Sequence, residues 1–239
     1  MASDLQIDTS PVGQVLRPAD PGETVILYLH SDRYLSSAPQ VALDLASDLA
    51  LKSNAVVVCA RYRPVYPAAL ADVLAAYGYC QAWGPVAIAG EGLGAGLAAA
   101  LLLHLRDVEA TPPRGAVLVS GLLDLTMEAH SLLINRADPT FDVAELRRKA
   151  AHYAAGNTLT DPLLSPLHGN LHGLPPTQLL VAGTDPLLDD SITFAARAAR
   201  SGVTVDLRVR PDEASLRRDA PQATADFIRS RLCEDLPRL

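Results

Sequence analysis

The sequence has few aromatic residues and almost no lysine. Aromatic residues make up 5% of the 239 residues, and the two lysines are Lys52 and Lys149. With 20 basic and 27 acidic residues the formal net charge is -7, which opposes the phosphate contacts on which nucleic-acid-binding proteins depend. The longest apolar run, Leu97–Leu103, is far shorter than a membrane span. The sequence therefore argues against a nucleic-acid partner and against a membrane partner.

Cysteine is also scarce, and no segment has the composition of a secretory signal. Cys59, Cys80 and Cys233 are odd in number, widely spaced and without a metal-ligand pattern. The first ten residues include Asp4 and Asp8 and have no apolar h-region. The preference for arginine over lysine is typical of a GC-rich bacterial genome. We therefore expect a cytoplasmic bacterial protein with no metal and no cofactor.

Short β-branched runs alternate with longer Ala/Leu-rich stretches at helical spacing, and this alternation predicts βαβ units. We expect one domain over residues 1–239, with a twisted, mostly parallel sheet of about eight strands. The predicted strands are Val25–His30, Ala55–Ala60, Val86–Ala89, Ala116–Ser120, Gln178–Ala182 and Val203–Val209, with one or two edge strands in Leu5–Pro18. The predicted helices are Gln40–Leu51, Ala68–Trp83, Leu93–Arg106, Val143–Ala155, Ser191–Ser201 and Pro221–Leu232.

One stretch runs from a buried strand through a glycine-rich turn into a helix of small residues. Residues 86–96 read VAIAGEGLGAG, with Gly92 at the centre of the turn. This is the context of a nucleophile elbow, G-x-S-x-G, in which a strained serine stands above the sheet. Here the central residue is glycine, so the turn geometry is retained without a hydroxyl nucleophile.

At this motif the chain resembles the hormone-sensitive-lipase-like branch of the α/β-hydrolases. The resemblance extends in the family's order over about residues 24 to 211. The matching segments are YLHSDRY from Tyr28, YRP from Tyr62, YPAAL from Tyr66, DPLLSPL from Asp161, GLPPT from Gly173 and GTDPLLDD from Gly183. The resemblance implies an α/β-hydrolase fold in which the family's lid is largely absent, because His30 follows only 29 residues.

The resemblance also implies which residues occupy the positions of the catalytic triad. It places Asp185 at the acid and Gly92 at the nucleophile, while Ser215 stands where the histidine belongs. The last histidine of the whole chain is His172. Ser31, Asp32 and Arg33 replace the glycines whose backbone N–H groups would face an oxyanion. Of the three triad positions, only the acid is retained.

These departures favour a non-hydrolytic enzyme acting on a small biosynthetic intermediate. In this hypothesis cyclisation, elimination or carbon–carbon bond formation takes place in a natural-product pathway. We expect four residues to catalyse, namely Asp185, Asp32, Arg33 and Tyr34. We expect the substrate pocket to include His30, Ser31, Glu91, Gly92, Leu93, Ser120 and Ser215.

Two alternatives remain open. A catalytically inactive pseudo-hydrolase with a degenerate triad would bind a ligand or a partner protein, which the number of replaced positions favours. An active carboxylesterase would need a substitute nucleophile such as Ser31 or Ser215 and a base that the sequence does not supply. In each case we expect a small-molecule substrate or ligand, and a homodimer is compatible with the sequence.

Overall fold

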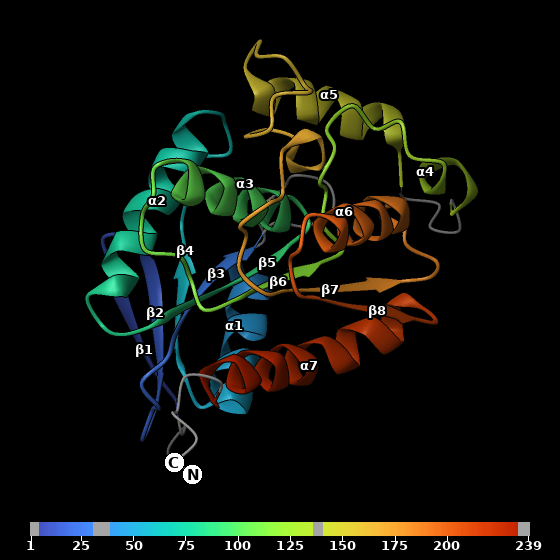
Figure 1. Ribbon diagram of the computed structural model, residues 1–239. Coiled ribbons are helices and arrows are strands. Elements are labelled where there is room, and N and C mark those ends of the chain that lie inside the picture. Colours follow the sequence, from blue (N-terminus) through green and yellow to red (C-terminus); the bar gives the residue numbers. More distant parts are fainter. Residues whose placement is uncertain (1–4, 31–38, 136–140, 234–239) are drawn as a thin grey trace.

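The computed structural model describes residues 5–30, 39–135 and 141–233, whose strands form one eight-stranded sheet (Figure 1). Its order is β1-β2-β4-β3-β5-β6-β7-β8. The β1–β2 and β2–β4 pairs are antiparallel, and every later pair is parallel, which confirms the predicted mostly parallel sheet. The bounds are β1 Leu5–Ser10, β2 Gly13–Pro18, β3 Val25–His30, β4 Val56–Ala60, β5 Val86–Glu91, β6 Ala116–Val119, β7 Thr177–Ala182 and β8 Val205–Arg210.

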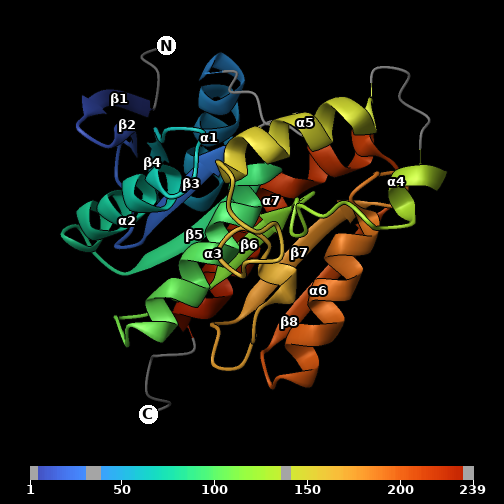
Figure 2. The same ribbon diagram turned by 90° about the horizontal axis from the view of Figure 1, so that it is seen from above.

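Helices cover both faces of this sheet. The bounds are α1 Pro39–Ser53, α2 Ala68–Gln81, α3 Leu93–Asp107, α4 Ser131–Ile134, α5 Val143–Ala154, α6 Leu188–Arg200 and α7 Glu213–Cys233, with a 3₁₀ turn at Pro166–His168. The smaller core cluster joins one face of the sheet to α1 and α7, and the larger cluster joins the other face to α2, α3, α5 and α6 (Figures 1 and 2). The chain therefore forms a three-layer α/β structure.

The central strands β3 and β7 are buried at every position because both of their faces are covered. In β3 Leu27 and Leu29 belong to the larger cluster, while Ile26 and Tyr28 belong to the smaller one. All six residues of β3 are buried. The parallel strands end at one common edge, so the loops after β5, β6 and β7 meet there.

Two predicted elements differ from the structure. The last helix begins at Glu213 rather than Pro221, because Asp212 accepts a hydrogen bond from the Ser215 backbone N–H at 2.8 Å and so satisfies a free donor of the first turn. Pro221 lies inside this helix rather than at its start. The four-residue helix α4 was not predicted, since it is too short to show helical periodicity.

Candidate active site

The elbow is present at the end of β5. Gly92 links β5 to α3 with φ 59° and ψ -124°, a conformation that side-chain-bearing residues rarely adopt. Its N–H donates to the Val119 carbonyl at 3.1 Å, and its carbonyl accepts from Leu122 at 3.0 Å. These bonds tie the turn to the end of β6. The expected strand–turn–helix geometry is therefore confirmed, with glycine at its apex.

The two flanking glycines allow α3 to approach the sheet closely. A Cβ on Gly94 would overlap the carbonyl oxygen of Leu29 in β3. A Cβ on Gly90 would lie 2.5 Å from the Gly94 carbonyl oxygen. Both clashes are with backbone, which cannot move aside as a flexible side chain can. The glycines therefore fix the position of the first turn of α3 above the strand ends.

Ser120 and Asp185 form a buried hydrogen-bonded pair beside the elbow. The Ser120 hydroxyl donates to Asp185 Oδ2 at 2.6 Å, and the Leu187 N–H donates to Asp185 Oδ1 at 2.9 Å. Ser120 and Asp185 are 3% and 0% exposed. Ser120 also has a positive φ of 45°, which is strained for a residue other than glycine. Strain and burial of this kind gather at functional sites, so the pair is the main candidate for chemistry.

His30 and Glu91 form a second polar pair, at the ends of β3 and β5. His30 Nδ1 lies 3.7 Å from Glu91 Oε2, and the Tyr28 hydroxyl lies 3.4 Å from each of these two atoms. The pKa of Tyr28 is raised well above its usual value, mainly by burial and then by the Glu91 charge. The Tyr62 hydroxyl donates to the His30 carbonyl at 2.8 Å. This pair is held on the β3 side of Gly92, opposite the Ser120–Asp185 pair.

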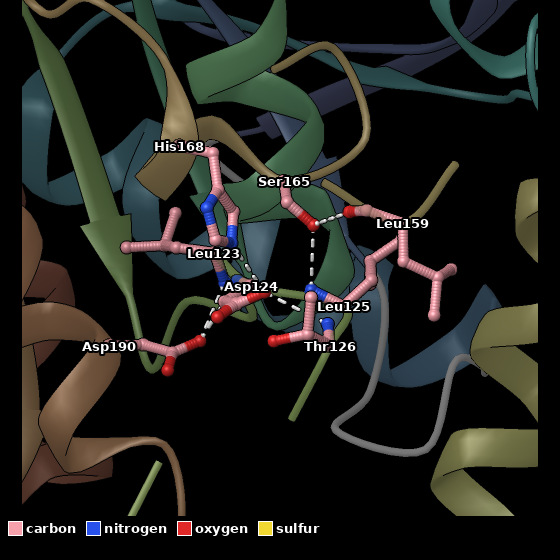
Figure 3. A network of polar contacts seen from close by, with 8 residues as sticks. All are labelled: Leu123, Asp124, Leu125, Thr126, Leu159, Ser165, His168 and Asp190. Atoms are coloured by element: carbon pink, nitrogen blue, oxygen red, sulfur yellow. Dashed lines mark hydrogen bonds and ion pairs between the residues drawn. The ribbon is translucent and has the colours of Figure 1, made fainter. Parts of the chain in front are cut away.

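A further polar network fixes the loop that follows Ser120 (Figure 3). Asp190 Oδ2 accepts from the backbone N–H groups of Leu123 and Asp124 at 2.9 and 3.1 Å. Asp124 Oδ1 lies 3.1 Å from His168 Nε2, and Ser165 accepts from the Leu125 N–H at 2.8 Å. This network was not predicted, because more than 60 residues separate Asp190 from its two partners in the sequence.

Asp190 carries a perturbed carboxyl group inside this network. Burial raises its pKa to about 7, and the nearby Asp124 charge acts in the same direction. The hydrogen bonds from Leu123 and Asp124 lower the pKa but do not offset burial. The ionised form is therefore disfavoured in the folded protein relative to the unfolded chain.

This shift predicts that stability falls as the pH rises. The stabilising contribution of protonated Asp190 is complete below about pH 4, and it is lost as the pH passes about 7, for a total of about 2–4 kcal/mol. Asp190→Asn keeps an oxygen acceptor for the two N–H groups and should flatten that part of the pH profile. Chemical unfolding between pH 5 and 8 measures how the free energy of unfolding depends on pH, with Asp189→Asn as the control. Parallel profiles for wild type and Asp190→Asn would contradict the assignment.

The remaining predicted site residues are placed as follows. Leu93 is buried at the start of α3. Ser215 lies in the first turn of α7, where its N–H is bonded to Asp212. Ser31, Asp32, Arg33 and Tyr34 fall outside the described residues. The structure thus bonds Ser120 directly to Asp185, ties Gly92 to Val119 and Leu122 on either side of Ser120, and holds His30 near Glu91 at the ends of β3 and β5.

Asn135 is a further residue at the site that was not predicted. Its side-chain amide donates to the carbonyl oxygens of Gly183 and Asp185 at 3.1 and 2.9 Å. These bonds hold the loop that carries the Asp185 carboxylate. No sequence motif predicts this contact, because 50 residues separate Asn135 from Asp185.

Comparison with known proteins identifies this arrangement. A family profile described as the alpha/beta hydrolase fold matches residues 26–214. The chain belongs to the α/β-hydrolase family. The relatives of this hydrolase include an acetyl-hydrolase of Streptomyces hygroscopicus, 36% identical over 206 residues that cover 82% of this chain and 69% of that protein. An esterase of Acinetobacter venetianus is 29% identical over 207 residues, covering 82% and 68% of the two chains.

Solved structures give the same result for the hydrolase fold. An esterase of the bacterial hormone-sensitive lipase family superposes with a TM-score of 0.90 at 27% identity, covering 97% of this chain and 86% of that one. An esterase/lipase from an uncultured bacterium gives a TM-score of 0.88 at 28% identity, covering 96% and 86%. The predicted membership of the hormone-sensitive-lipase-like branch is therefore supported.

The same comparisons overturn the functional prediction. The sequence predicted a non-hydrolytic enzyme of natural-product biosynthesis, or else a pseudo-hydrolase that binds a ligand or a partner protein. Both inferences are wrong, because the relatives are named acetyl-hydrolase and esterase and the structural neighbours are esterases. The replaced triad positions pointed away from hydrolysis, whereas the hydrolase features along the rest of the chain are retained.

The structure also bears on membranes and metals. In the described part of the chain, no helix combines the length and apolar character needed to cross a membrane. Nor do three or more histidine, cysteine, aspartate or glutamate side chains gather as metal ligands among those residues.

Proposed function

We propose that this hydrolase cleaves carboxylic esters of short acyl groups. The observation that carries the proposal is the buried Ser120–Asp185 pair, bonded at 2.6 Å beside the elbow of an esterase fold. The names of the relatives support the reaction class, and the acetyl-hydrolase supports a short acyl group.

We further propose that the catalytic triad is degenerate, so that hydrolysis proceeds without an acyl-enzyme at the elbow. Gly92 has no hydroxyl group to acylate, and no histidine follows His172 in the sequence. An ester bound above Gly92 is then attacked by water rather than by a side chain. The turnover is correspondingly lower than that of an esterase with a complete triad.

In this route Asp185 is the general base and Ser120 relays the proton. A water molecule attacks the ester carbonyl carbon and gives a proton to Ser120 Oγ, whose own proton passes to Asp185 Oδ2. The tetrahedral intermediate then breaks its bond to the alcohol oxygen. This oxygen takes the proton back from Asp185 through Ser120, so the products are the alcohol and the carboxylic acid. The Leu187 N–H, bonded to Oδ1, keeps Oδ2 directed at Ser120. A positioned base of this kind contributes about 10²–10⁴-fold.

Ser120→Ala tests the relay. Removing the hydroxyl breaks the hydrogen bond between Ser120 and Asp185 Oδ2, so we expect turnover of p-nitrophenyl acetate to fall by at least about tenfold. Ser131→Ala is the matched control, because Ser131 is a buried serine whose hydroxyl binds the Pro186 carbonyl in the same loop. Wild-type turnover in Ser120→Ala, or an equal loss in both variants, would contradict the relay.

We propose a cytoplasmic location as well. The described cysteines, Cys59 and Cys80, are buried and free, and burial raises the pKa of their thiols to about 11 and about 12. Disulfides form in oxidising compartments, so the free state of these two described cysteines supports a reducing one.

A further inference from the structure

The strand β8 forms one outer edge of the sheet, between α6 and α7 (Figure 1). Within the part of the chain that the structure describes, β7 is its only strand partner. The Thr204 and Arg210 carbonyls accept hydrogen bonds from the β7 side, at 2.9 and 2.7 Å. Successive residues of a strand direct their backbone N–H and carbonyl groups to opposite sides. The residues whose backbone groups point away from β7 are therefore Val205, Leu207 and Val209.

The same outward-facing residues carry exposed apolar side chains. Leu207 is 37% exposed and Val209 is 47% exposed. Both side chains lie on the α6 face of the sheet, because Val205, at the same parity of the strand, packs against the core cluster that includes Phe194 of α6. On α6 itself Ile192 is also exposed. An edge strand with such backbone and side chains is a template for pairing with a strand of another chain.

The other face of β8 carries charges of alternating sign. Arg208 and Asp206 are paired at 2.8 Å, and Gln178 also donates to Asp206 at 2.7 Å. The two charged side chains are nevertheless 40% and 34% exposed. Each therefore keeps its present partners and still presents its charge to a second chain.

A second copy of this chain is the partner that the charge pattern fits. A two-fold axis relates two copies of an edge strand in antiparallel orientation, with outward-facing residues opposite one another. Three registers at the middle of β8 meet this condition, and they place Asp206, Leu207 or Arg208 opposite its own copy. Centring on Asp206 or on Arg208 sets like charges opposite each other, which is destabilising. Centring on Leu207 sets Asp206 opposite Arg208 on both sides of the axis.

We propose that β8 pairs with β8 of a second copy, so that the chain forms a homodimer with Leu207 at the two-fold axis. Val205 then stands opposite Val209, and the outward N–H and carbonyl groups bond across the axis. On the α6 face the exposed Leu207 and Val209 side chains are covered by their counterparts. On the other face four charges alternate in sign around a rectangle. The two sheets become one continuous sheet.

Sedimentation velocity of charge variants tests the proposal. We expect wild type to sediment as a dimer, and Asp206→Arg and Arg208→Asp each to raise the dissociation constant by at least about tenfold, because each sets like charges across the axis. An equal mixture of these two variants should form a heterodimer, and the double variant Asp206→Arg/Arg208→Asp should dimerise again. Asp8→Arg, the same change on the edge strand β1, is the control and should stay dimeric. Thermal unfolding checks that each variant is folded.

Leu207→Pro tests the backbone pairing. It removes an N–H that points away from β7, so the bonds between β7 and β8 are kept, and proline is tolerated at such positions of edge strands. We expect a folded monomer. Leu207→Ala keeps the N–H and should weaken the dimer less than Leu207→Pro does.

Three results would overturn the proposal. A wild type that stays monomeric up to its solubility limit would leave this edge to a strand of a different protein. A dimer that persists unchanged in both single charge variants and in Leu207→Pro would form through another surface. Folded single charge variants that neither associate when mixed nor regain the dimer in the double variant would contradict the register centred on Leu207.

Discussion

Asp185→Asn is expected to lower the turnover of p-nitrophenyl acetate by about 10²–10⁴-fold, the contribution of a positioned general base. The amide keeps an oxygen that can accept from the Leu187 N–H, so the loop after β7 should keep its structure. The asparagine amide lacks the negative charge with which the Asp185 carboxylate accepts the proton from Ser120. The measurement is a kcat at pH 7, together with the melting temperature.

The control for this result is Asp189→Asn. Asp189 lies four residues further along the same segment and accepts from the Ser131 N–H at 2.8 Å, without a contact to Ser120. Its replacement should leave kcat within about twofold of wild type. A folded Asp185→Asn protein with full turnover would remove this carboxylate from the mechanism.

Gly94→Ala is expected to destabilise the protein by roughly 2–4 kcal/mol, because its Cβ would overlap the Leu29 carbonyl oxygen in β3. The clash involves backbone on both sides, so α3 must move away from the sheet. Since α3 begins directly after Gly92, turnover should fall together with stability. Urea unfolding measures the change in free energy.

Gly78→Ala is the matched control, because Gly78 lies inside α2 and a Cβ there meets nothing within 4 Å. That variant should be stabilised by about 0.5–1 kcal/mol, through the better helix propensity of alanine. If both variants shifted stability alike, the close approach of α3 to β3 would not be the reason for Gly94.

Most of the fold could be predicted from local pattern. Val25–His30 is a strand with the predicted bounds, since a short, nearly continuous apolar run is typical of a parallel strand that is buried on both faces. The helix start at Glu213 could not be predicted in this way. Pro221 is a typical first residue of a helix, and packing of α7 against the sheet and α1 outweighs the cost of holding it inside.

The site could be predicted only in part. The resemblance placed Asp185 and Gly92 at their positions, and the structure adds that Ser120 binds Asp185 directly. Sequence spacing does not give that bond, because 65 residues separate the partners. Asp189 and Asp190 look alike in the sequence as acids of a first helical turn, and only burial distinguishes the pKa of Asp190.

The central claim is that ester hydrolysis here needs no nucleophile at residue 92. The direct test compares wild type with Gly92→Ser for p-nitrophenyl acetate turnover, burst kinetics and the intact mass after treatment with a serine-directed sulfonyl fluoride. We predict turnover by wild type without a burst and without a mass increase, and no gain in turnover in Gly92→Ser. Background rates for wild type, with turnover and a covalent adduct appearing only in Gly92→Ser, would contradict the claim.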